Sequence, residues 1–442
     1  MSEALEIILE EKMPAKDLSR SERRRVVIIG AGFAGMAAVQ ALRKCDAEII
    51  LIDRRNHNIF QPLLYQVATA VLASAEIAAP IRKLTEDQKN LSVLWGEVKG
   101  VDLKARFVEV DCNAVRLKRI SFDYLIVATG VQPSYFGHDE FARYAPTLKT
   151  ITDAELIRTK LLSAYEMAEM TDDADEQTRQ MTFVLVGAGP TGVELAASIA
   201  QLATVTLRSN FRKIDPAKTS ILLLEGGNRV LPSFAESLSR KVARRLEKLG
   251  VKVMTGAMVE KVNEQGVTVA GKLIKSATVL WTAGVSASPI VKMVGVATDR
   301  AGRACIGPFM NAPDQQGIFV VGDASSAMQN ERPVPGVAQA AMQQGRYVGR
   351  LIARELKGKS QARPFRYHDK GNMAVVGKNF AILESGRLRM SGLFAWLAWA
   401  FIHIIALPHG QNRMRVRKQW LWSYFSGQRS SLLMSEGPHR VK

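Results

Sequence analysis

The chain has 442 residues, of which 47% are hydrophobic and 23% are charged. This length predicts two to three domains, and this composition excludes disordered, collagen-like and disulfide-scaffold proteins. The formal net charge of +18 favours anionic partners, but no helix-turn-helix, RNP or zinc-finger pattern accompanies it, so we expect no nucleic acid partner.

The cysteines and histidines exclude several kinds of site. Cys45, Cys112 and Cys305 lie far apart without a CxxC pair, so we expect neither a disulfide framework nor a local redox-active dithiol. The six histidines show no metal-type spacing such as HxxxH, and we predict no metal site. No Ser/His/Asp set or pair of carboxylates stands out, so nothing in the sequence supports a hydrolase.

Residues 25–53 predict a nucleotide-binding βαβ unit. A buried strand runs into Gly30-Ala-Gly32-Phe-Ala-Gly35, an Ala-rich helix follows, and a second strand ends in Asp53. Gly30 permits the tight turn, Gly32 lets a pyrophosphate approach the backbone, and Gly35 allows the helix to pack closely on the strand. Asp53 follows Gly35 by 18 residues, which suits an acid that binds an adenosine ribose.

The same order of elements repeats later in the chain. A strand leads into Gly187-Ala-Gly189-Pro-Thr-Gly192, a helical stretch follows, and the next strand ends in Glu225. Two βαβ units predict two nucleotide-binding domains. The acidic residues 172–176, just before the second unit, are interpreted as a solvated linker.

Two acidic residues of the second unit have alternative interpretations. Glu225 lies 33 residues after the last glycine, where about 20 is typical, and residues 207–218 are interpreted as an inserted loop. As a ribose-binding acid it favours NADH over NADPH, although Arg229 nearby weakens that inference; an ordinary strand-end acid is the alternative. Glu194, which we place in the first turn of the following helix, either complements the helix dipole or lies beside a nicotinamide.

Further candidates follow at the ends of other predicted elements. Strands end in small-residue turns at Gly130 and Gly284, and another ends at Asp323, which either binds a ribityl or ribose hydroxyl or caps the next helix. Gln339 and Gln343 lie four residues apart and share a helix face. Spacing alone favours ordinary polar positions for these two amides.

The C-terminal region differs in composition from the rest of the chain. Four of the six tryptophans lie in residues 391–425, together with a basic cluster at 413–418. The apolar run Leu393 to Leu407 has 15 residues, whereas spanning a bilayer takes roughly 20. Aromatic and basic residues favour a membrane interface with anionic lipid, so we expect this region to lie on a membrane. A dimer interface is the alternative.

From about residue 25 to 433 the chain resembles the type II NADH dehydrogenases, single-subunit flavoenzymes that pass electrons from NADH to membrane quinone without pumping protons. The motifs that carry the resemblance are Phe60-Gln-Pro62-Leu-Leu-Tyr65-Gln-Val-Ala, Ala128-Thr-Gly130, Gly189-Pro-Thr-Gly-Val-Glu194-Leu-Ala, Trp281-Thr-Ala-Gly284-Val, Gly322-Asp323-Ala, Ala338-Gln339-Ala-Ala-Met-Gln343 and Tyr367-His-Asp-Lys370-Gly.

The resemblance implies an α/β fold with two Rossmann-like dinucleotide-binding domains on the glutathione-reductase-like plan, plus a C-terminal membrane-anchoring helical segment. We expect a polar N-terminal arm (1–24), an FAD-binding domain (25–148 and 295–380), an NADH-binding domain (149–294) and a membrane-associating region (381–442).

The resemblance also assigns site residues. FAD is the expected cofactor and NADH the expected substrate. The residues expected to bind them are Gly30, Gly32, Gly35, Asp53, Gly130, Asp323 and Gln339 for FAD, and Gly187, Gly189, Gly192, Glu225 and Gly284 for NADH. The residues given a catalytic role are Glu194, near the nicotinamide, Gln339 and Gln343, in the family's AQxxxQ quinone motif, and Lys370, close to the flavin. Pro62 and Tyr65 are expected to line the substrate channel.

The resulting prediction is an FAD-dependent enzyme of the respiratory chain that takes hydride from NADH and reduces membrane quinone to quinol. We expect a homodimer bound peripherally (monotopically), through residues 391–425 and anionic lipid, to the cytoplasmic face of the cell inner membrane.

Three alternatives remain open. A soluble flavoprotein reductase would serve a ferredoxin-like protein, and a non-enzymatic nucleotide sensor would bind NADH without turnover. A sulfide:quinone enzyme would need a cysteine pair, for which Cys112 and Cys305 are poorly placed.

Overall fold

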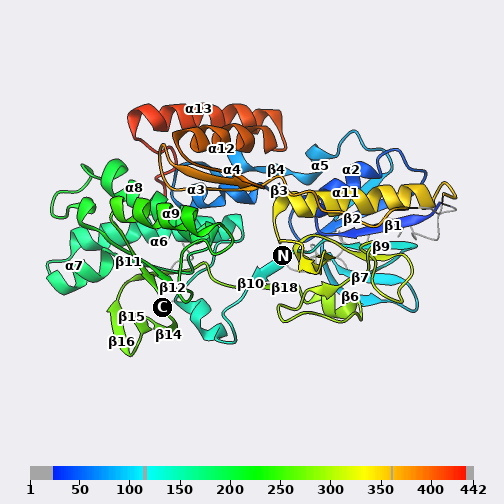
Figure 1. Cartoon of the computed structure of the whole chain (residues 1–442), viewed down its shortest axis with the longest axis horizontal. Coiled ribbons are helices and arrows are strands. Elements are labelled where there is room, and N and C mark those ends of the chain that lie inside the picture. Colours follow the sequence, from blue (N-terminus) through cyan, green and yellow to red (C-terminus); the bar gives the residue numbers. More distant parts are fainter. Residues whose placement is uncertain (1–22, 113–116, 360–361, 435–442) are drawn as a thin grey trace, which may run out of the picture.

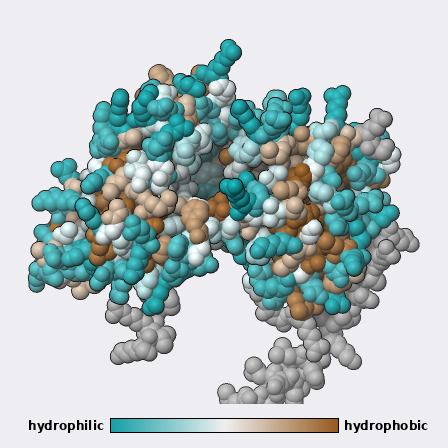
Figure 2. Space-filling model, turned by 60° about the horizontal axis from the view of Figure 1, so that its bottom comes forward, coloured by the Kyte–Doolittle hydropathy of each residue, from teal (hydrophilic) through white to brown (hydrophobic). Residues whose placement is uncertain are grey.

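The computed structural model describes residues 23–112, 117–359 and 362–434. It has two lobes, each built on a parallel sheet (Figure 1), and a recess separates the lobes on the face shown in Figure 2. The strands of the first sheet, in spatial order, are β20 (Ile318–Val320), β9 (Tyr124–Val127), β1 (Arg25–Ile29), β2 (Glu48–Asp53) and β5 (Leu91–Trp95).

The first sheet is covered on both faces, which explains why its central strand is an unbroken apolar run. Val26 and Ile28 pack with helices α2 (Phe33–Ala41) and α11 (Ala338–Glu355). Val27 and Ile29 point the other way, toward a small antiparallel sheet. The strands of that sheet are β6 (Glu97–Asp102), β7 (Phe107–Asp111) and β8 (Lys118–Ser121).

The second lobe repeats this plan. Phe183 and Leu185 pack against helices on one face of its sheet, and Val184 and Val186 pack against a three-stranded antiparallel sheet on the other. The parallel strands, in order, are β13 (Val251–Thr255), β12 (Ser220–Glu225), β11 (Thr182–Val186) and β17 (Thr278–Trp281). The covering elements are α6 (Ile151–Met170), α8 (Pro190–Gln201), α9 (Glu236–Lys248), β14 (Val259–Asn263), β15 (Gly266–Val269) and β16 (Lys272–Lys275).

The C-terminal part is a three-stranded antiparallel sheet followed by two helices that lie along one edge of the molecule (Figure 1). The sheet consists of β24 (Asn372–Val375), β25 (Ala381–Ser385) and β26 (Leu388–Gly392), and the helices are α12 (Leu393–Ala406) and α13 (Gly410–Ser426). Among the described residues no helix combines the length and hydrophobicity needed to cross a bilayer.

Short elements complete the chain. Strands β10 and β18 pair antiparallel where the chain passes between the lobes. Their bounds and those of the remaining short helices and strands are β3 (His57–Ile59), α3 (Leu64–Ala68), α4 (Ser74–Ile77), β4 (Ala78–Pro80), α5 (Ile81–Leu84), β10 (Val131–Pro133), β18 (Val285–Ala287), α10 (Ile290–Met293), β19 (Ala304–Cys305), β21 (Ser325–Ser326), β22 (Met328–Gln329) and β23 (Arg332–Pro333).

The interpretation of residues 172–176 as a linker is wrong in part. Helix α7 (Ala174–Gln180) begins there, because the Asp173 carboxylate accepts hydrogen bonds from the backbone N–H groups of Asp175 and Glu176 and caps the helix. Helix α8 begins at Pro190, so Glu194 lies in its second turn and not in its first. The helix dipole acts mainly on the first turn, which weakens the dipole interpretation of Glu194.

Candidate functional site

The first glycine turn joins β1 to α2. Gly30 has φ +101°, and its N–H donates to the carbonyl of Ile52 at 2.8 Å. A Cβ on Gly35 would lie 1.8 Å from the Gly30 carbonyl oxygen, so only glycine allows this contact between helix and turn. A Cβ on Gly32 would meet nothing within 4 Å, so space is open beside the backbone at that point.

Asp53 is held against this turn. Its Oδ2 accepts from the N–H of Ala31 at 2.7 Å, and its Oδ1 accepts from the N–H of Arg55 at 2.8 Å. Each carboxylate oxygen keeps a second lone pair, so the acid can still accept ribose hydroxyl groups.

The second glycine turn has the same construction. Gly187 has φ +99°, and a Cβ on Gly192 would lie 1.9 Å from the Gly187 carbonyl oxygen, while Gly189 is open. Glu225 accepts from the N–H of Ala188 at 2.8 Å with Oε2, and from the N–H of Gly227 at 2.8 Å with Oε1.

Arg229 does not turn toward Glu225. Its guanidinium donates to the carbonyl of Pro232 at 2.9 Å.

Small-residue turns follow β9 and β17. Gly130 has φ +63°, and a Cβ there would meet nothing within 4 Å; Gly284 has φ +74°, and a Cβ there would lie 2.5 Å from the Phe136 ring. The hydroxyl oxygen of Thr129 is buried and has no hydrogen-bond partner within the described part of the chain. A buried hydroxyl beside open backbone is the arrangement expected where a ligand supplies the missing partner.

Asp323 lies in a turn that a residue missed by the sequence analysis holds in place. Gln344 is 3% exposed, and its Oε1 accepts from the N–H of Gly322 at 2.6 Å and from the hydroxyl of Ser325 at 3.3 Å. The sequence gives no sign that Gln344 is buried, because it follows another glutamine, Gln343, among polar residues.

Lys149 is the second residue that the sequence analysis missed. Burial lowers the pKa of its ammonium group, while the nearby Asp323 raises it and the nearby Arg55 lowers it. Lys149 therefore lies close enough to Asp323 and Arg55 for their charges to interact. No motif in the sequence marks this position.

Glu194 is brought to the interface between α8 and β24. Its Oε1 accepts a long hydrogen bond, 3.4 Å, from the N–H of Val375. Burial raises the pKa of this carboxyl to about 8, and the hydrogen bond only partly opposes that shift. A carboxyl with this pKa can hold or release a proton near neutral pH.

Gln339 and Gln343 bind backbone rather than pointing freely into a cavity. Gln343 donates to the carbonyl of His368 and accepts from its N–H, both at 2.9 Å. Gln339 donates to the carbonyl of Gly371 at 2.8 Å and accepts from the N–H of Lys370 at 3.0 Å. The two amides thus fix the segment before β24 that carries the exposed side chain of Lys370.

The segment around Pro62 and Tyr65 lies between the first glycine turn and the C-terminal helices. Pro62 is in a short 3-10 turn, Gln61–Leu63, just before α3. The ring of Phe60 is 6.0 Å from that of Phe33, the first residue of α2, and 6.1 Å from the imidazole of His403 on α12. An aromatic series therefore connects α12 to the first residue of α2, beside the first glycine turn.

His403 contributes an uncharged ring to this series. It bonds the carbonyl of Trp399 at 2.7 Å, and burial lowers the pKa of its imidazole to about 4.

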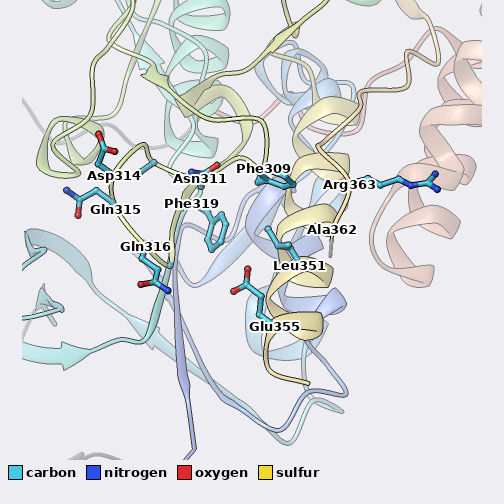
Figure 3. A pocket seen from close by; sticks show the side chains of 12 residues that line it. Phe309, Asn311, Asp314, Gln315, Gln316, Phe319, Leu351, Glu355, Ala362 and Arg363 are labelled. Carbon is cyan, nitrogen blue, oxygen red and sulfur yellow. The ribbon is translucent and has the colours of Figure 1, made fainter. Parts of the chain in front are cut away.

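A hollow of about 960 Å³ lies elsewhere (Figure 3). In it, Leu351 and Glu355 of α11 project toward Phe319 and Gln316. Gly317, which lines the hollow, directly precedes β20, so the hollow lies at the amino end of that strand. Both glycine turns lie at the carboxyl ends of their strands, where parallel sheets bind ligands. This hollow is not part of the candidate site.

The described residues contain no group of three or more His, Cys, Asp or Glu side chains that could hold a metal ion. All three cysteines are free.

The chain is similar to known flavin- and pyridine-nucleotide-dependent enzymes. Residues 24–345 match the family model described as pyridine nucleotide-disulphide oxidoreductase. The chain is 42% identical to the type II NADH:quinone oxidoreductase NdhA of Mycobacterium tuberculosis, over 93% of this chain and 90% of that protein. It is 41% identical to the type II NADH:quinone oxidoreductase Ndh of the same organism, over 94% of this chain and 91% of that protein.

Solved structures share the fold. The NDH2 of Plasmodium falciparum in complex with NADH superposes with a TM-score of 0.85 at 18% identity, covering 93% of this chain and 100% of that one. The sulfide:quinone oxidoreductase of Aquifex aeolicus has a TM-score of 0.69 at 17% identity, covering 91% and 95%.

Proposed function

The chain belongs to the type II NADH:quinone oxidoreductases, and from that premise we propose that its flavin is FAD, bound at the first glycine turn, with NADH at the second. The protein oxidises NADH and reduces a quinone, and the family implies that it pumps no protons. The observation that carries the assignment of the two sites is their common construction: Asp53 and Glu225 each accept from the amide that follows the first glycine of their turn.

The residues of the first site fit FAD. Open backbone at Gly32 and Gly130 leaves room for a pyrophosphate, Asp53 offers acceptors for the ribose, and Thr129 has an unused buried hydroxyl. Asp323 would hold ribityl hydroxyl groups. FAD, when bound, supplies the two-electron chemistry that links NADH to quinone.

At the second site, Gly187, Gly189 and Gly192 would bind the pyrophosphate of NADH, and Glu225 its ribose. A 2′-phosphate would meet the carboxylate of Glu225, which supports a preference for NADH over NADPH. Gly284, in the turn after β17, would border the nicotinamide end.

Four polar residues would act where the two sites approach each other. We assign Glu194 the role of holding or releasing a proton beside the nicotinamide, because its pKa of about 8 allows both states near neutral pH. Gln339 and Gln343 would position Lys370 near the flavin through the backbone contacts described above. Pro62 and Tyr65 would line the path of the quinone.

The C-terminal helices would bind a membrane surface as a monotopic anchor. Large apolar side chains on them are exposed, among them Phe394 at 74% and Phe425 at 82%. The exposed basic residues of α13 would bind anionic headgroups; they are Arg413, Arg415, Arg417 and Lys418. Because NADH is a cytoplasmic reductant, we assign the protein to the cytoplasmic face of the cell inner membrane.

We extend the proposal to organisation. The first lobe would be the FAD-binding domain (25–148 and 295–380), the second the NADH-binding domain (149–294), and residues 381–442 the membrane-associating region. The N-terminal arm lies almost wholly outside the described residues. We also propose a homodimer, which light scattering of the purified protein would test: a mass near 48.6 kDa would contradict it.

An electron balance tests the proposed function. Purified protein is mixed under nitrogen with NADH and a short-chain quinone, and the cofactor is released and identified. We expect FAD, and one quinol formed for each NADH consumed. NADH oxidation that proceeds with a ferredoxin-like protein but not with quinone would support the soluble reductase instead.

A further inference from the structure

Helix α13 reaches the proposed acceptor path through a chain of hydrogen bonds. The indole N–H of Trp420 donates to Oε1 of Gln66 at 2.7 Å, and Nε2 of Gln66 donates to the hydroxyl oxygen of Tyr65 at 2.9 Å. The ring of Trp420 stacks on Trp399 of α12, with 5.2 Å between the ring centres. Residues 354 positions apart in the sequence therefore meet at a single amide.

Burial and the indole N–H together fix the direction of these hydrogen bonds. Gln66 is 5% exposed and Tyr65 is 7% exposed, so their polar groups depend on protein partners. An indole N–H can only donate, so it selects the carbonyl oxygen of Gln66 and turns the NH₂ group toward Tyr65. The Tyr65 oxygen then acts as an acceptor for Gln66, and its own hydrogen is left to donate elsewhere.

Glu194 lies close enough to Tyr65 for their charges to interact. Its negative charge, when present, raises the pKa of the Tyr65 hydroxyl, which burial already raises. Because its oxygen accepts from Gln66, the Tyr65 hydroxyl keeps one hydrogen that it can donate to a ligand. Within the described part of the chain, no acceptor for that hydrogen is found.

Further hydrogen bonds connect α3, which carries Tyr65, to α8, which carries Glu194. The guanidinium of Arg429, just beyond α13, donates to the carbonyls of Thr69 and Ser198. The hydroxyl of Thr69 donates to the carbonyl of Tyr65 at 2.8 Å and lies 2.7 Å from the hydroxyl of Ser198. The end of α13 thereby joins the helix of Tyr65 to the helix of Glu194.

We propose that Trp420 is a positioning residue for the quinone: it orients Gln66 so that the Tyr65 hydroxyl donates a hydrogen bond to a quinone carbonyl oxygen. This inference rests on the proposed function and deepens it, because a helix on the membrane-facing edge then forms part of the acceptor site.

The test compares Trp420→Phe with Trp422→Phe. Phenylalanine keeps an aromatic ring against Trp399 but has no N–H, while Trp422, on the same helix, is 62% exposed and serves as the matched control. We expect Trp420→Phe to raise KM for a short-chain quinone about tenfold, the equivalent of one lost hydrogen bond, and to leave the rate of flavin bleaching by NADH unchanged. Trp422→Phe should leave both unchanged.

Tyr65→Phe completes the design. If Trp420 acts through the Tyr65 hydroxyl, Tyr65→Phe alone raises the quinone KM at least as much, and adding Trp420→Phe raises it no further. The inference is overturned if Trp420→Phe leaves the quinone KM at the wild-type value, if both half-reactions slow together, or if the two effects multiply. If quinone does not reoxidise the reduced flavin of the wild-type protein, the proposed function is overturned, and this inference falls with it.

Discussion

At the residue scale, burial decides the charge of Glu194. Its pKa rises from 4.5 in the unfolded chain to about 8 in the folded protein. Between these two values the folded protein binds the additional proton, so its stability falls as the pH rises. Below pH 4.5 the carboxyl is protonated in both states and contributes no difference.

Glu194→Gln, which is neutral at every pH, should therefore match the wild type below pH 4.5 and exceed its free energy of unfolding by about 5 kcal/mol above pH 8. Urea unfolding between pH 4.5 and 9 measures this difference. Glu236→Gln, in the exposed first turn of α9, is the control and should not show this difference. A difference for Glu194→Gln that stays constant with pH would contradict the assigned pKa.

Gln344 supports a second prediction at this scale. Gln344→Leu leaves the buried N–H of Gly322 without an acceptor, which costs about 1–3 kcal/mol, and loosens the turn that carries Asp323. We expect purified Gln344→Leu to hold a smaller fraction of its flavin, measured as the ratio of flavin to protein absorbance. Arg346→Gln, exposed on the same helix, should keep the wild-type ratio; equal flavin content in Gln344→Leu would refute the role of Gln344.

At the element scale, α12 presents Phe394 and Phe401 to solvent seven residues apart, on one face. Replacing both with serine removes apolar area that a membrane would bury, so we expect reduced co-sedimentation with vesicles that contain anionic lipid. Added salt should also weaken the binding of the wild-type protein to these vesicles, because salt screens the charges of the basic residues of α13. Met170→Ser, an exposed apolar residue on α6, should bind vesicles like the wild type; unchanged binding by the double variant would contradict membrane contact through α12.

Elements could be predicted from the sequence where neighbouring residues alone determine them. The strands of both sheets were predictable because burial on both faces demands apolar runs, and the turns because Gly35 and Gly192 each leave no room for a Cβ. Helix α7 was missed because the cap at Asp173 outweighs the polar composition around it. The beginning of α8 was placed too late because Pro190, favoured at a first helical position, was not counted as helical.

At the scale of the whole molecule, the duplication of the nucleotide-binding plan was visible in the sequence, whereas contacts between distant segments were not. The amides of Gln339 and Gln343 looked free, and only the fold brings residues 368–371 against them. The contact of Trp420 with Gln66 likewise joins segments whose separation in the sequence carries no periodic signal. Spacing therefore predicted the two glycine turns, and tertiary structure was needed to connect them to the C-terminal helices.

Transfer of electrons from NADH to the flavin and from the flavin to quinone can be followed in a single absorption experiment. Purified protein is held under nitrogen, NADH is added, and a short-chain quinone is added afterwards. We predict that NADH bleaches a flavin band and that quinone restores it promptly. A band that NADH bleaches but quinone leaves bleached, or a folded protein without any flavin band, would contradict the central claim.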